Sequence, residues 1–121
     1  MGYFTSIERK LKRAIADAES DPGKIVLITP VIGDEFFHLD SATCESEDSL
    51  TLRYGSEGKK KRKKGEQDGY ELTLTKNYDQ VTVTKGQIKF LSEDEPGILF
   101  FGDTDWVMKK IEMLNRRSAS L

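Results

Sequence analysis

The chain has very few of the residue types on which enzymes and cross-linked proteins depend. Of its 121 residues, one is a cysteine, Cys44, and one is a histidine, His38. A lone cysteine cannot form a disulfide within the chain, so we expect a reducing, intracellular location and not secretion. No apolar run approaches the roughly 18 residues of a transmembrane helix, and no apolar signal-peptide core is present.

The residues that could support catalysis are His38, Asp40 and Cys44. A cysteine–histidine nucleophile needs the two side chains in contact and a third group that orients the imidazole. The alternation in "FFHLD" (36–40) places His38 and Asp40 on one strand face, whereas Cys44 follows in an acidic turn. A metal site built from the same residues lacks a spaced ligand pair and a fourth ligand. The sequence therefore predicts a protein that is not an enzyme, with no catalytic residue, metal or cofactor.

Motifs that bind phosphate or calcium are also missing. The segment "GSEGKKK" (55–61) does not have the glycine and lysine spacing of a P-loop. The acidic turns at 44–49 and 92–95 lack the spaced oxygen ligands and central glycine of a calcium loop. We interpret both turns as polar surface that protects the ends of strands from association.

What the chain does have is one strongly basic segment in an otherwise acidic sequence. "GKKKRKKG" (58–65) contains six successive cations, in a chain with 19 Lys and Arg residues against 21 Asp and Glu. Without those six, 13 cations face 21 carboxylates, a net charge of −8. A polyanion is therefore expected to bind locally, at this basic run or on another basic face. The predicted anion-binding residues are Lys59, Lys60, Lys61, Arg62, Lys63 and Lys64.

Apolar periodicity predicts one α+β domain over residues 1–121. Residues 5–19 have an apolar stripe at helical spacing, and Thr5 with Glu8 forms a capping box at its start. Strand patterns follow, and the short connections between the later strands allow only hairpins, so the sheet is expected to be antiparallel. The predicted strands, about seven, are 24–28, 35–40, 50–54, 70–74, 81–84, 87–90 and 97–101.

A C-terminal helix is expected to cover one face of this sheet. It begins at Asp103 or Thr104 and carries an apolar stripe of Val107, Ile111 and Leu114. A run of antiparallel strands closed by a helix with a tryptophan resembles the element order of pleckstrin-homology-like rolls, a similarity of topology and not of motif. We expect the last residues, 116–121, to fray. The sheet residues expected beneath this helix and Trp106 are Leu52, Leu72, Val83 and Phe90.

The basic run lies between the two clearest strands, 50–54 and 70–74. If these pair as a hairpin, residues 55–69 form its loop, which the repulsion among six cations makes extended and mobile. Such a loop suits an adaptor that contacts an anionic partner, either an acidic protein surface or an anionic lipid. The alternative is a nucleic-acid-associated protein that uses the loop for sequence-independent phosphate contacts, although the run has no aromatic neighbours. Two further interpretations are a nuclear import signal, because "KKKRK" (59–63) resembles one, and a solvated loop without function.

Overall fold

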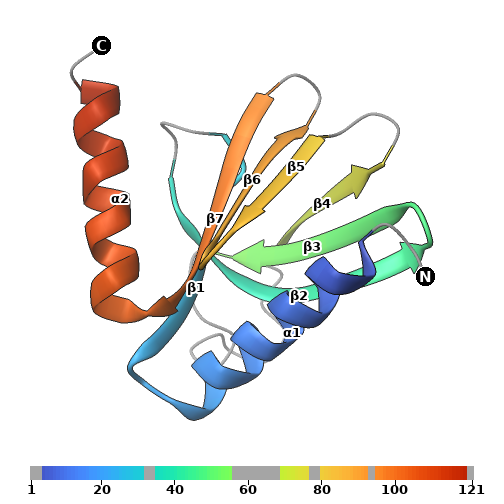
Figure 1. Ribbon diagram of the computed structural model, residues 1–121, viewed down its shortest axis with the longest axis horizontal. Helices are drawn as coiled ribbons and strands as arrows, with labels where there is room; N and C mark the ends of the chain where they lie inside the picture. The colour runs from blue at the N-terminus through green and yellow to red at the C-terminus, as the bar shows by residue number, and fades with distance from the viewer. Residues whose placement is uncertain (1–3, 32–34, 56–68, 77–79, 93–94, 120–121) are drawn as a thin grey trace.

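The computed structural model describes residues 4–31, 35–55, 69–76, 80–92 and 95–119 (Figure 1). It confirms the predicted α+β class, with an N-terminal helix, a seven-stranded antiparallel sheet and a C-terminal helix packed against the sheet. The elements in chain order are α1 (Thr5–Ser20), β1 (Lys24–Thr29), β2 (Phe37–Ser46), β3 (Ser49–Gly55), β4 (Gly69–Thr75), β5 (Gln80–Thr84), β6 (Gln87–Ser92), β7 (Glu95–Asp103) and α2 (Thr104–Ala119).

All seven strands form one sheet in the order β4-β3-β2-β1-β7-β6-β5, and each neighbouring pair is antiparallel. β1 lies at the centre, where its apolar sequence suits burial on both faces, and residues 26–28 are all buried. β3 and β4 pair in register from Ser49 opposite Thr75 to Gly55 opposite Gly69. This pairing confirms the predicted hairpin. β4 and β5 are the two edges of the sheet and do not pair with each other, so the expectation of a hairpin between strands 70–74 and 81–84 is wrong.

α1 packs against one face of the sheet, which bends around it (Figure 1). Its buried side chains, Ile7 and Leu11, lie four residues apart, and buried Phe4 precedes the helix on the same side. Burial of such side chains is the main favourable term in folding, at about 1.5–3 kcal/mol each. The buried sheet residues in this principal core are Val26, Ile28, Leu39, Ala42, Leu50, Leu52, Tyr54, Leu74, Ile88, Phe90 and Leu99.

α2 packs against the opposite face, so the predicted partners of this helix are wrong. Leu52 and Phe90, expected under α2, belong to the core beneath α1. The central strands β1 and β7 are apolar on both faces, and each face therefore needs its own helix. A second, smaller core forms between α2 and the sheet from Leu27, Ile98, Phe100 and Val107, with Ile25, Phe36, Trp106, Ile111 and Leu114 packed around it.

The predicted capping box at the start of α1 is also wrong. Phe4 is the N-cap residue, no side chain caps the helix, and the Glu8 amide donates to the Phe4 carbonyl at 2.8 Å. The Glu8 carboxylate instead accepts a hydrogen bond from the backbone N–H of Cys44 on β2. A tertiary contact between helix and sheet has replaced the local one that the spacing of Thr5 and Glu8 predicted.

β2 extends beyond the predicted 35–40 and includes Cys44, which was expected in a turn. Its pairing with β3 shifts by one residue at Asp40. The buried residues on either side of this shift, Leu39 and Ala42, are therefore three residues apart and not two. A β-bulge of this kind interrupts the two-residue alternation without ending the strand. The loss of alternation after residue 40 was therefore a bulge and not a strand end.

Candidate anion-binding cleft

The predicted anion-binding residues, 59–64, lie outside the residues that the structure describes. The hairpin on either side is described up to Gly55 on β3 and from Gly69 on β4, which face each other across the pair. The assignment of anion binding to the basic run therefore stays a prediction from the sequence.

An aromatic cluster lies beside the ends of that hairpin. Tyr54 on β3 and Tyr70 on β4 are opposite each other, and their rings stack with centroids 5.7 Å apart. The Phe37 ring lies 5.2 Å from Tyr54 and 5.5 Å from Tyr70. Tyr70 is 54% exposed. Strand register, and not local spacing in the sequence, brings these three rings together.

The candidate catalytic residues do not form a nucleophilic site. His38 and Cys44 both lie on β2, six residues apart, and a strand that rises about 3.3 Å per residue separates them by about 20 Å. Burial, together with the nearby Glu8 carboxylate, raises the pKa of the Cys44 thiol, which keeps it protonated and poorly nucleophilic. Among the described residues, no three His, Cys, Asp or Glu side chains are grouped so that they could hold a metal ion.

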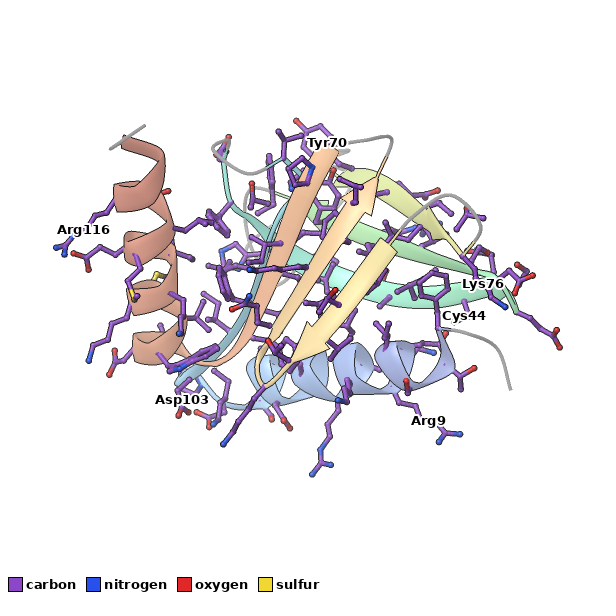
Figure 2. The ribbon with its side chains drawn as sticks, turned by 45° about the horizontal axis from the view of Figure 1, so that its top comes forward. Arg9, Cys44, Tyr70, Lys76, Asp103 and Arg116 are labelled. Atoms are coloured by element: carbon purple, nitrogen blue, oxygen red, sulfur yellow. The ribbon has the colours of Figure 1, made fainter. Side chains whose placement is uncertain are left out.

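A cleft of about 590 Å³ lies between α1 and the β5–β6 turn. It is next to the C-terminal end of β5, where Figure 2 shows the strand ending just above the helix. The β1 and β7 strands contribute the remaining wall. The lining residues are Lys10, Arg13, Ala14 and Asp17 from α1, Lys24 from β1, Val83 to Gly86 from β5 and the turn, and Phe101 and Gly102 from β7.

Helical spacing places three charged residues of α1 along the cleft. Lys10, Arg13 and Asp17 are three and four residues apart, so they share one side of the helix. This side is next to the buried stripe that contains Leu11, and all three charged residues are exposed. The helix therefore turns its apolar side to the sheet and a predominantly basic side to the cleft.

A glycine fixes the turn on the other side of the cleft. Gly86 has φ +71°, a left-handed conformation that glycine adopts without strain. Its carbonyl accepts a hydrogen bond from the Phe101 amide at 3.0 Å, and a Cβ at this position would lie 2.7 Å from the Trp106 ring. These contacts hold the β5–β6 turn against β7 and α2. They therefore also fix the backbone of Lys85, which precedes Gly86 in the turn.

The cleft is electropositive. Four cations line it, and Asp17 is the one carboxylate among the described residues that do so. Within the described part of the chain, Lys10, Arg13 and Lys85 have no ion pair. Lys24 pairs with Asp103, a contact that raises the pKa of Lys24. Three cations that have no ion pair among the described residues therefore line one recess, in a chain that is acidic outside its basic run.

The bottom of the cleft is apolar. Ala14, Val83 and Phe101 line it, and all three side chains are half-buried and contact the principal core. An apolar base with a cationic rim can hold a ligand that carries both an apolar group and negative charge. This site could not be predicted from local sequence patterns, because α1, β1 and the β5–β6 turn meet only in the folded chain. Its one signal was that Lys10 and Arg13 lie off the apolar stripe of the first helix.

Comparison with known proteins gives no relative for this chain. No protein-family model, no curated protein and no solved structure matches it. The resemblance to pleckstrin-homology-like rolls therefore stays a prediction from element order. No helix in the described part of the chain combines the length and apolar character needed to cross a membrane.

Proposed function

We propose that this protein is a non-enzymatic binding or adaptor module that contacts an anionic partner inside the cell. The basic run, 59–64, supplies one set of cations. The observation that carries the proposal is the cleft, where Lys10, Arg13 and Lys85 converge without carboxylate partners among the described residues. Cations that are left unpaired in an acidic chain are suited to attract and orient a negatively charged ligand.

An acidic protein surface is the partner that these features support best. The cationic side chains line a recess, which a protein segment can enter and a flat lipid surface cannot. Among the described residues, the large apolar side chains that are exposed are Tyr70, Met108 and Met113, and none of them lines it. Lipid docking commonly combines basic residues with apolar side chains that insert beside them.

A nucleic-acid-associated function is the second candidate, and the exposed Tyr70 favours it. Tyr70 lies beside the hairpin ends that flank the basic run, and a base can stack on an exposed aromatic ring. Lysines of the run would then contact phosphates without reading sequence. Against this, the net charge of −8 outside the run repels a polyanion that extends over the surface.

Binding assays with four probes test the proposal. Polyglutamate, anionic vesicles, a mixed-sequence DNA duplex and a single strand are each titrated at low and physiological salt. The assays compare the wild-type protein with a variant that has Gly and Ser in place of residues 59–64. Preferential binding of polyglutamate supports the adaptor, whereas preferential single-strand binding that Tyr70→Ala weakens supports the second candidate. If none of the four binds even at low salt, the proposed function is wrong.

A further inference from the structure

We infer that the cleft between α1 and the β5–β6 turn is a docking site for a short acidic protein segment that carries an apolar side chain next to its carboxylates. The inference rests on the proposed function and adds a site that is built entirely from described residues. It also specifies the chemistry of the partner.

The cations at the rim of the cleft are the reason to expect carboxylates on the partner segment. Arg13 offers a planar guanidinium that can bind a carboxylate through two parallel hydrogen bonds, whereas Lys10 and Lys85 act as flexible point charges. The three come from two elements on opposite sides of the recess, α1 and the β5–β6 turn. A segment with acidic side chains on both sides of its backbone can contact the two walls together.

The bottom of the cleft specifies the apolar side chain. Ala14, Val83 and Phe101 present half-buried apolar surface beneath the cationic rim. Covering this surface with an apolar side chain removes it from water, which favours binding. A DNA duplex presents its phosphates and keeps the faces of its bases inside the stack, and the acyl chains of a membrane lie below its headgroups. The volume of about 590 Å³ is within the range of sites that enclose small ligands, which suits a few residues of a peptide.

Asp17 limits where the acidic residues of the partner can lie. It lines the cleft on the same side of α1 as Arg13, one turn further along the helix. Lys24, which also lines the cleft, already has Asp103 as its partner. The carboxylates of the segment are therefore directed toward Lys10, Arg13 and Lys85 and away from Asp17.

Figure 2 identifies a matched control on the same helix. Arg9 is exposed, does not line the cleft, and points away from the sheet. Arg9→Glu and Arg13→Glu change the net charge equally, so a general electrostatic effect would affect them equally. Lys85→Glu tests the opposite wall, and Asp17→Asn removes the one repulsive carboxylate among the described lining residues.

The experiment measures fluorescence anisotropy with a labelled peptide that alternates glutamate and leucine. Arg13→Glu and Lys85→Glu are expected to weaken binding about tenfold, since each replaces an attraction by a repulsion, and Arg9→Glu by less than about threefold. Asp17→Asn is expected to strengthen it about threefold. Replacement of the leucines in the peptide by glycine is expected to weaken binding to the wild-type protein. Circular dichroism and thermal melts verify that each variant folds.

The inference and the proposed function fail in different ways. If the wild-type protein binds anions, but Arg13→Glu and Lys85→Glu behave like Arg9→Glu, the cleft is not the site and the proposed function still stands. If the cleft variants lose vesicle or DNA binding but retain the peptide, the occupant is lipid or nucleic acid and the inference is wrong. Self-association that Arg13→Glu abolishes would identify a second copy of the chain as the occupant, which also overturns it.

Discussion

The Glu8 carboxylate accepts a hydrogen bond of 2.6 Å from the backbone N–H of Cys44, and this contact joins α1 to β2 across 36 residues of sequence. The Glu8 side chain is 19% exposed and also lies 3.6 Å from Lys12. Both the hydrogen bond and the neighbouring cation favour the ionised form. A helix that packs on a sheet through apolar side chains thus gains one directional, charged contact at its N-terminal end.

This contact makes part of the folding stability depend on pH. The hydrogen bond from Cys44 is the largest influence on Glu8 and lowers the pKa of its carboxyl, and Lys12 lowers it further against the opposing effect of burial. A carboxyl whose pKa is lower in the folded state stabilises the protein above its unfolded pKa of about 4.3, and the contribution is lost as the pH falls through the folded value. Glu8→Ala is expected to lower the unfolding free energy by about 2 kcal/mol at pH 7, as for a hydrogen bond to a charged group.

Urea denaturation of the wild type and of Glu8→Ala, at neutral pH and in acid, measures this effect. The difference between the two proteins is expected to shrink as Glu8 becomes protonated in the wild type. Glu8→Gln is the control, because its amide oxygen can still accept the hydrogen bond but does not titrate. A difference between wild type and Glu8→Ala that stays constant from neutral pH into acid would contradict the assignment.

The two cores are expected to differ in their contribution to stability. Leu11 on α1 is 1% exposed and lies in the principal core, whereas Leu114 on α2 is partly buried at the border of the smaller one. Leu11→Ala should therefore cost about 2–5 kcal/mol, and Leu114→Ala about 1 kcal/mol. Chemical denaturation of both variants provides the comparison. A larger cost for Leu114→Ala would place the principal core beneath α2.

Much of the architecture could be predicted from the sequence because both helices and most strands show clear apolar periodicity. The hairpin of β3 and β4 followed from the alternation of Leu50, Leu52 and Tyr54 with polar residues. The side of the sheet that each helix covers could not be predicted, since apolar residues on both faces of β1 suit either helix. The cleft could not be predicted either, because local spacing does not show that Lys10 and Lys85 line the same recess.

The basic run is expected to be dispensable for folding. β3 and β4 pair along their whole length up to Gly55 opposite Gly69, so the hairpin has its own ladder and cross-strand contacts. Loop closure depends only weakly on composition, and Gly and Ser in place of residues 59–64 should change the unfolding free energy by less than about 2 kcal/mol. A larger loss, measured by urea denaturation, would mean that the run packs against the domain and that its binding tests need a different variant.

The β5–β6 turn is expected to tolerate no side chain at Gly86. Its φ of +71° costs an L-residue about 1–2 kcal/mol, and an added Cβ would lie 2.7 Å from the Trp106 ring and 3.0 Å from the Phe101 carbonyl. Gly86→Ala should therefore lower the unfolding free energy by about 2 kcal/mol or more.

Gly23→Ala is the matched control for this substitution, because a Cβ there would meet the exposed Asp21 carboxylate at 3.2 Å, without a left-handed backbone. We expect it to change the unfolding free energy by less than about 0.5 kcal/mol. Trp106 is the single tryptophan of the chain, so its fluorescence should shift in Gly86→Ala. Equal stability of the two variants, together with unchanged fluorescence in Gly86→Ala, would show that the turn is not held against α2, and Lys85 would then lose its fixed place at the cleft.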